Sequence, residues 1–329
     1  MQDIYGHAIR HPAYTELLKR HPDNPILKPP DWPYPVNAVF NPGAVRLRDT
    51  GETLLLLRVE DRSGLSHLTA ARSVDGVSDW KIDPEPTLLA DREKRPEEFW
   101  GVEDPRITWV PELNQYAVVY TGYSQSGPGV CLALTSDFRT FDHFGMIHPP
   151  DDKDAALLPC RFGGLWMMIH RPVPSHGAAH IWASVSPDLR HWGNRKILLP
   201  AREGGWWDAS KIGLSPPPIQ TKEGWLVFYH GVRIVASGSI YRVGLALLDL
   251  EDPFKVIHRS REWIFGPRET YEHLGDVQQV VFPCGTVTGD DGDSLKIYYG
   301  SADTTVCLAT ASINELLEYL KKNSYLGTA

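Results

Sequence analysis

The chain has 329 residues and a net charge of −8 at pH 7, with 41 acidic against 33 basic side chains. This balance argues against a nucleic-acid-binding protein, because such proteins present a basic face to the phosphates. Residues 1–10 lack the apolar core of a secretory signal, and no run approaches the roughly 20 apolar residues of a membrane span. We therefore expect a cytoplasmic protein whose partners include neither a nucleic acid nor a membrane.

The N-terminal part of the chain predicts a helix followed by a proline-rich segment. The apolar residues of Pro12–Arg20 have helical spacing, whereas the prolines of Pro22–Pro35 prevent the helix from continuing. We interpret residues 1–36 as an N-terminal helical arm. Such an arm indicates a homo-oligomer if it crosses to a second copy of the chain, but a cap on its own chain fits equally well.

Beyond this arm, one pattern of strands recurs five times at a period of roughly 50 to 65 residues. In each repeat an apolar strand is followed by a strand that ends on or near Ser-x-Asp. The apolar strands are Leu54–Arg58, Tyr116–Gly122, Leu165–Arg171, Trp225–Gly231 and Leu295–Ser301. The strands that follow them are Leu68–Ser73, Val130–Ser136, Ile181–Ser186, Tyr241–Asp249 and Val306–Ser312. Five units of about four strands predict an all-β fold, a five-bladed β-propeller that residues 1–329 form as one domain.

After the last repeat, the sequence predicts a helix at residues 312–323. Ser312 is a candidate N-cap with Glu315 three residues on, which is the spacing of a capping box. Leucines follow at helical spacing. We expect this C-terminal helix to pack on the blades.

The spacing of the histidines and cysteines indicates neither a metal site nor disulfide bonds. The chain has 13 histidines, but none lies in an HxxH, HExxH or Cys/His pattern with ligand spacing, so we expect no metal. The four cysteines show no CxxC spacing and lie in or beside apolar strands, which predicts buried free thiols. They are Cys131, Cys160, Cys284 and Cys307.

The apolar strands end on charged or polar residues, among them Arg58, Arg171 and His230. Charges at the ends of buried strands are costly unless they face a wet cavity, and strand ends on one face of a propeller converge on its axis. The alternative is a set of solvated strand ends with no common site. The repeats also begin on polar groups, and the Glu-Asp-Pro-Arg run at 103–106 makes Asp104 a candidate acid, because its neighbours can shift its pKa.

Several separated motifs resemble those of glycoside hydrolase family 130, the inverting β-mannoside phosphorylases and related mannosidases. The motifs are Gly101–Thr108, Lys153–Pro159, His170–Pro172, Lys211–Gly213, Tyr229–Gly231, Val280–Cys284 and Tyr298–Asp303. They occur in the family's order, and the resemblance runs from about Asn41 through the C-terminal helix. It implies a five-bladed β-propeller, the fold that the repeats indicate independently.

The resemblance further implies an inverting reaction in which inorganic phosphate attacks the anomeric carbon of a β-linked mannose and releases α-mannose 1-phosphate. The enzyme is then a phosphorylase of the hexosyltransferase type, with a β-mannoside and phosphate as partners and no cofactor. Asp104 matches the family's general acid, whose proton reaches the glycosidic oxygen through a mannose hydroxyl. An inverting hydrolase needs a second carboxylate to activate water, whereas phosphate, already anionic, needs positioning and charge neutralisation.

The same resemblance assigns two sets of binding residues. The phosphate set is Lys153, Arg171, Lys211, His230 and Tyr241. The mannoside set is Asn41, Arg58, Asp61, His176, Asp276, Phe282 and Asp303. Lys153 departs from relatives that carry arginine at this place, which keeps the positive charge but loses the bidentate fork.

Two other functions remain open on the sequence alone. A β-1,2-mannosidase of the same fold would use water and is expected to lack the basic phosphate set. A non-catalytic mannoside-binding propeller would need neither Asp104 nor the cations. The form of Gly101–Pro105 and the Lys153–Asp154 pair favour β-1,2-linked mannosides as the substrate, while the acceptor sugar stays open.

Overall fold

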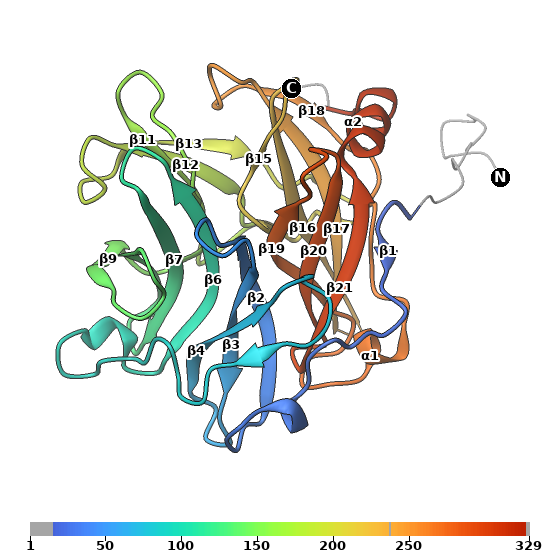
Figure 1. The fold of residues 1–329 in the computed structure, drawn as a ribbon. Helices are drawn as coiled ribbons and strands as arrows, with labels where there is room; N and C mark the ends of the chain where they lie inside the picture. Colours follow the sequence, from blue (N-terminus) through green and yellow to red (C-terminus); the bar gives the residue numbers. More distant parts are fainter. Residues whose placement is uncertain (1–15, 237, 327–329) are drawn as a thin grey trace.

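The computed structural model describes residues 16–326 apart from residue 237, and its strands form five sheets around a central axis (Figure 1). We call these sheets blades 1 to 5. Blade 1 contains β2 (Ala38–Arg46), β3 (Thr53–Glu60), β4 (Ser66–Ser73) and β5 (Lys81–Ile82). Blade 2 contains β6 (Val102–Val110), β7 (Gln115–Ser124), β8 (Gly127–Thr135) and β9 (Asp142–His148). Blade 3 contains β10 (Asp152–Leu157), β11 (Trp166–Pro172), β12 (Ile181–Ser186) and β13 (Gly193–Leu199).

Blades 4 and 5 complete the ring. Blade 4 contains β14 (Lys211–Leu214), β16 (Trp225–Val235), β17 (Gly238–Leu248) and β18 (Val256–Arg259), with β15 (Ile219–Gln220) paired to β16. Blade 5 contains β19 (Val281–Thr288), β20 (Ser294–Ser301), β21 (Thr305–Ser312) and β1 (Lys19–Arg20). The short helices are α1 (Thr270–His273) and α2 (Ile313–Lys322), with 3₁₀ turns at Pro29–Asp31 and Pro96–Glu98. The predicted five-bladed β-propeller is confirmed, and its treatment as one domain stays a prediction.

The core lies between neighbouring blades rather than at the axis. Among the described residues, a separate hydrophobic cluster fills each of the five blade interfaces. The second strand of each blade is therefore covered on both faces, as the fully buried run Leu54–Leu57 of β3 illustrates. When both faces of a strand are buried, apolar residues do not alternate with polar ones along it. This explains why the second strands of the five repeats appear in the sequence as continuous apolar runs.

The N-terminal segment closes the propeller as a strand. Lys19 and Arg20 pair antiparallel with Thr310 and Ala309 of β21, so β1 becomes the outer strand of blade 5. The predicted helix over Pro12–Arg20 is therefore wrong for its described C-terminal end, and its beginning lies outside the described residues. A free edge on β21 and a buried site for Leu18 outweigh the local helical spacing.

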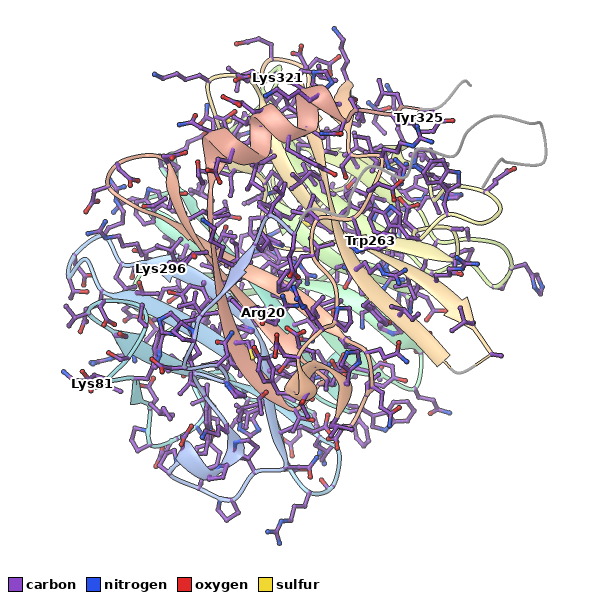
Figure 2. The ribbon with its side chains drawn as sticks, turned by 90° about the vertical axis from the view of Figure 1, so that its right-hand side faces the viewer. Arg20, Lys81, Trp263, Lys296, Lys321 and Tyr325 are labelled. Carbon is purple, nitrogen blue, oxygen red and sulfur yellow. The ribbon has the colours of Figure 1, made fainter. Side chains whose placement is uncertain are left out.

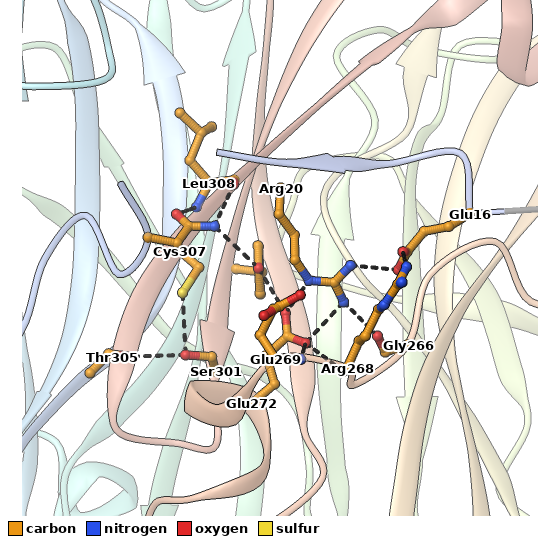
Figure 3. Close-up of polar contacts among 12 residues, drawn as sticks. Glu16, Arg20, Gly266, Arg268, Glu269, Glu272, Ser301, Thr305, Cys307 and Leu308 are labelled. Carbon is orange, nitrogen blue, oxygen red and sulfur yellow. Dashed lines mark hydrogen bonds and ion pairs between the residues drawn. The ribbon is translucent and has the colours of Figure 1, made fainter. Parts of the chain in front are cut away.

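A buried ion-pair network holds β1 in place (Figure 3), and Figure 2 labels its central residue, Arg20, in the whole molecule. Arg20 donates to both carboxylate oxygens of Glu272 at 2.8 and 2.9 Å and to the carbonyl oxygen of Gly266 at 2.7 Å. The Glu272 side chain is fully buried, and it also accepts from the Tyr299 hydroxyl at 2.9 Å. Glu16 pairs with the other side of the Arg20 guanidinium. The network thus joins the N-terminal segment to α1, to the loop that precedes α1 and to β20 of blade 5.

Arg20→Gln is expected to destabilise the protein by about 3–5 kcal/mol, because it leaves the Glu272 carboxylate buried without its cation. Urea unfolding at neutral pH measures the loss. Arg46→Gln is the matched control, because the Arg46–Asp290 pair is exposed to solvent and should contribute no more than about 1 kcal/mol. Equal losses in the two variants would show that the network does not hold β1.

The C-terminal helix confirms the prediction for residues 312–323. Ser312 is the N-cap of α2, and its hydroxyl accepts from the Glu315 backbone N–H at 3.2 Å. Leu316, Leu317 and Leu320 are buried in the cluster between blades 4 and 5. None of the helices in the described ranges is long and apolar enough to span a membrane. The four cysteines are free thiols, of which Cys160 alone is only half-buried.

Candidate active site

Ten of the thirteen predicted site residues line one cavity of about 320 Å³ at the propeller axis. They come from all five blades, as the sequence analysis expected for converging strand ends. These ten are Asn41, Arg58, Asp104, Lys153, Arg171, Lys211, His230, Tyr241, Phe282 and Asp303. The other lining residues are Pro128, Asp154, Val173, Val277 and Val280.

The inner strands of blades 1, 2 and 3 share one backbone device that aims a polar side chain into the cavity. Asn41, Asp104 and Asp154 each have a positive φ, of 45°, 49° and 52°. Each lies where the pairing register of its strand shifts, between Phe40 and Gly43, Glu103 and Arg106, or Lys153 and Ala156. A bulge redirects a side chain, and Asn and Asp tolerate the left-handed conformation better than other non-glycine residues. The sequence therefore places short polar residues at these three bulges.

Asp104 is held by two hydrogen-bond donors from blade 1 and lies near a cation from blade 3. Its Oδ1 accepts from Asn41 Nδ2 at 2.9 Å and from Arg58 Nη1 at 3.2 Å. Lys153 Nζ lies 3.9 Å from Oδ2. Burial by itself raises the pKa of the Asp104 carboxyl, but Arg58, Lys153 and the bond from Asn41 outweigh burial, and its pKa lies below the usual value. Glu103 shares the two cations, at 3.0 Å from Arg58 and 3.9 Å from Lys153.

Cationic side chains also gather around the buried carboxylate of Asp154. Arg171 Nε donates to Asp154 Oδ2 at 2.8 Å, and Arg106 Nη2 lies 3.5 Å from Oδ1. Lys211 Nζ lies 5.2 Å from the centre of the Tyr241 ring. Burial and the nearby Arg171 guanidinium lower the pKa of Lys211. Four cations and three carboxylates line the whole cavity. Around Asp154 the cations outnumber the carboxylate, so this part of the cavity favours an anion.

His230 contributes a neutral ring to this set rather than a fourth cation. Burial lowers the pKa of His230 to about 4, against the opposing effect of Asp154, whose Oδ2 lies 3.4 Å from Nε2. The ring packs against Phe282 at 4.6 Å between centroids. At neutral pH His230 can therefore bind an anion only through a hydrogen bond.

Three predicted mannoside contacts lie outside the cavity. The Asp61 carboxylate accepts from the backbone N–H groups of Ser63 and Leu65, at 2.7 and 3.1 Å, and so closes the turn between β3 and β4. Asp276 is exposed and accepts from Asn37 Nδ2 at 2.9 Å. His176 is exposed in the loop between β11 and β12. The structure thus does not bring these three side chains to Asp104.

Asp154 is the important site residue that the sequence reasoning missed. It directly follows Lys153, and it occupies the bulge position that Asn41 and Asp104 occupy in blades 1 and 2. Comparison of the three repeats at this position would have found it. Its carboxylate positions Arg171 and His230, so its role depends on contacts across blades that a single sequence does not display.

Asp303→Asn is expected to raise the melting temperature at pH 7, with the gain vanishing toward pH 4. Burial raises the pKa of Asp303 to about 6, although Arg58 opposes the shift. In the unfolded chain the pKa of an aspartate carboxyl is about 3.9. Between pH 3.9 and pH 6 the folded state therefore binds more protons at Asp303 than the unfolded state does, so the protein loses stability as the pH rises through this range. Thermal unfolding of both proteins from pH 4 to pH 8 measures the difference. A gain independent of pH would exclude a raised Asp303 pKa as its cause.

The model of glycoside hydrolase family 130, described as beta-1,4-mannooligosaccharide phosphorylase, matches residues 17–322. A beta-1,4-mannooligosaccharide phosphorylase of Ruminococcus albus is 34% identical to this chain. The alignment covers 94% of this chain and 92% of the Ruminococcus protein. A 1,2-beta-oligomannan phosphorylase of Thermoanaerobacter sp. is 34% identical, covering 91% and 98%. The solved beta-1,2-mannobiose phosphorylase of Listeria innocua, in complex with beta-1,2-mannobiose, has a TM-score of 0.83 at 30% identity, covering 93% and 99%.

Proposed function

Because this chain belongs to glycoside hydrolase family 130, we propose that it is an inverting β-mannoside phosphorylase of the hexosyltransferase type. Its substrates are a β-mannoside and inorganic phosphate, with no cofactor, and its product is α-mannose 1-phosphate. The observation that carries this proposal is the cavity, which the buried Asp104 lines together with Lys153, Arg171 and Lys211. Carboxylate and cations are what phosphorolysis requires of one pocket.

The proposed roles follow from position. Asp104 is the general acid. Lys153, Arg171 and Lys211 neutralise the phosphate, with His230 and Tyr241 as hydrogen-bonding partners. Asn41, Arg58 and Asp303, on the Asp104 side, bind the mannose hydroxyls. Arginine grips phosphate through its planar fork and lysine through a compact charge.

The proposed reaction needs only the β-mannoside, phosphate and the proton of Asp104. A phosphate oxygen attacks the anomeric carbon from the face opposite the glycosidic oxygen, and the bond from this carbon to the glycosidic oxygen breaks. The Asp104 proton passes through a mannose hydroxyl to that oxygen, which leaves as the alcohol of the acceptor sugar. Attack from the opposite face converts the β-mannoside into α-mannose 1-phosphate.

Phosphate binding also accounts for how Asp104 carries a proton. In the protein without phosphate, Arg58 and Lys153 favour the ionised carboxylate and lower its pKa. A phosphate beside Lys153 competes for that cation and adds negative charge nearby, and both effects raise the pKa of a neighbouring carboxyl. We infer that Asp104 takes up its proton when phosphate binds.

The relatives are named for two linkages. The family model and the Ruminococcus protein carry β-1,4 in their names, whereas the Thermoanaerobacter and Listeria proteins carry β-1,2. We propose β-1,2-linked mannosides as the substrate. The structural match over 99% of the Listeria enzyme supports this choice, as do the Gly101–Pro105 motif and the Lys153–Asp154 pair.

The test is product analysis of β-1,2-mannobiose and β-1,4-mannobiose, each incubated with and without phosphate. We expect phosphate-dependent release of mannose 1-phosphate, faster from the β-1,2 disaccharide. Preference for the β-1,4 disaccharide would overturn the linkage and leave phosphorolysis intact. Equal release of free mannose without phosphate would make the protein a β-1,2-mannosidase. Binding of either disaccharide without any product would identify a mannoside-binding propeller.

A further inference from the structure

Two aromatic side chains of blade 2 lie exposed beside the cavity. Trp100 lies two residues before β6, the strand that carries Asp104, and Tyr123 lies near the end of β7. Their rings meet edge to face, with 5.4 Å between the centroids, yet Trp100 remains 40% exposed and Tyr123 37%. Neither the Trp100 Nε1 nor the Tyr123 hydroxyl has a hydrogen-bond partner among the described residues. These polar groups are therefore available to a ligand.

The exposed pair is continuous with the mouth of the cavity. Tyr123 lies directly opposite Pro128 in the ladder of β7 and β8, so the two side chains lie on the same face of blade 2. Pro128 lines the cavity, and so does the exposed Val173, which follows β11 of blade 3. An apolar strip thus runs from Trp100 and Tyr123 across Pro128 to the place where the cavity opens to solvent.

The backbone fixes the position of the two rings. The Trp100 N–H donates to the Tyr123 carbonyl oxygen at 2.7 Å, and the Tyr123 N–H donates to the Gly101 carbonyl oxygen at 3.0 Å. Gly101 has a φ of 119°, and a Cβ at this position would lie 2.7 Å from the carbonyl oxygen of Ser66 in blade 1. Glycine thus lets the segment pack closely on blade 1. Exposed apolar rings on a rigid backbone contribute little to the core and indicate a binding surface.

We propose that Trp100 and Tyr123 form an outer sugar-binding subsite for the part of a β-mannooligosaccharide that lies beyond the cleaved bond. This inference rests on the proposed phosphorolysis of β-mannosides. Because the reacting mannose lies inside the cavity, only the end of a chain can enter, and the remaining sugar residues leave through the mouth. Trp and Tyr offer an apolar ring to the C–H face of a sugar and a polar edge to its hydroxyls. The preferred substrate is therefore a chain of three or more sugar residues.

The test compares β-1,2-mannobiose with β-1,2-mannotetraose as substrates of the full-length protein. The wild type should have the higher kcat/KM for the tetrasaccharide. Trp100→Ala should lower kcat/KM for the tetrasaccharide roughly 3- to 10-fold more than for the disaccharide, about the effect of one aromatic contact. Tyr123→Ala should act in the same direction, and it replaces Trp100→Ala if that variant does not fold. Equal kcat/KM values in the wild type, or an equal loss on both substrates, would overturn the proposal.

Tyr325→Ala is the matched control. Tyr325 is also exposed, at 39%, and its ring contacts that of Trp206 at 5.3 Å between centroids, but both lie outside the cavity lining. The ratio of the two kcat/KM values should therefore equal that of the wild type. The same loss of preference in Tyr325→Ala as in Trp100→Ala would contradict the assignment. A changed elution volume of Trp100→Ala in gel filtration, with an unchanged ratio, would instead identify a contact between two copies of the chain.

Binding measurements distinguish a failure of the subsite from a failure of the proposed function. In calorimetry without phosphate, the tetrasaccharide should bind the wild type more tightly than the disaccharide, and Trp100→Ala should reduce this difference. That result in a protein that releases no mannose 1-phosphate would reject the phosphorylase and support the subsite. Equal affinities for the two saccharides would overturn the subsite even if phosphorolysis occurs.

Discussion

Asp104→Asn is expected to lower kcat for phosphorolysis of a β-mannoside by roughly 10²- to 10⁴-fold, the usual contribution of a general acid. Asparagine keeps the oxygen that accepts from Asn41 and Arg58, so the fold and the binding of the mannoside should persist. It has no acidic proton to give to the glycosidic oxygen. Steady-state rates with natural disaccharides, together with calorimetric binding, measure the two effects separately.

A change of leaving group distinguishes an acid from a merely structural carboxylate. An aryl β-mannoside whose phenolate leaves without a proton should be cleaved by Asp104→Asn with a much smaller deficit than a disaccharide. The control is Asp137→Asn, on the same blade, where the carboxylate caps an exposed turn through the backbone of Arg139 and Thr140. The same deficit with both substrates, or unchanged turnover, would remove Asp104 as the acid.

Lys211→Met is expected to raise the KM for phosphate by roughly 10- to 100-fold, since a hydrogen bond to a charged group contributes about 1.5–3 kcal/mol. The same substitution should raise the melting temperature. Burial and Arg171 disfavour the charged form of Lys211 in the protein without phosphate, as its lowered pKa shows. Methionine preserves much of the side-chain volume and removes the charge.

The two opposite signs make this prediction specific. Initial rates across phosphate concentrations and thermal unfolding without phosphate provide the readouts. Lys222→Met, in the exposed turn between β15 and β16, should change neither quantity. A lower melting temperature accompanied by an unchanged phosphate KM would show that Lys211 supports the fold and not phosphate.

Elements with strong burial constraints could be predicted from the sequence. The second strands of the blades lie between two hydrophobic layers, so their apolar runs gave the number of blades. The cap of α2 depends on Ser312 and Glu315, which are close in the chain. By contrast, β1 has only two residues, which are too few to show a periodicity. It forms because it pairs with the edge of β21, which lies almost 300 residues later in the chain.

The residues of the candidate site also differ in how far the sequence predicts their positions. Residues on strands or at bulges, such as Arg58 and Asp104, lie where the motifs indicated, because strand register fixes their direction. His176 and Asp276 lie in loops, whose paths depend on contacts that no local pattern encodes.

The most direct test of phosphorolysis is an NMR time course of β-1,2-mannobiose with the full-length protein and phosphate. Proton and phosphorus spectra identify the first product and its anomeric configuration before mutarotation. We expect α-mannose 1-phosphate to appear in equal amount to the released mannose, and no turnover when phosphate is omitted. Free mannose as the first product at the same rate without phosphate would contradict the phosphorylase assignment.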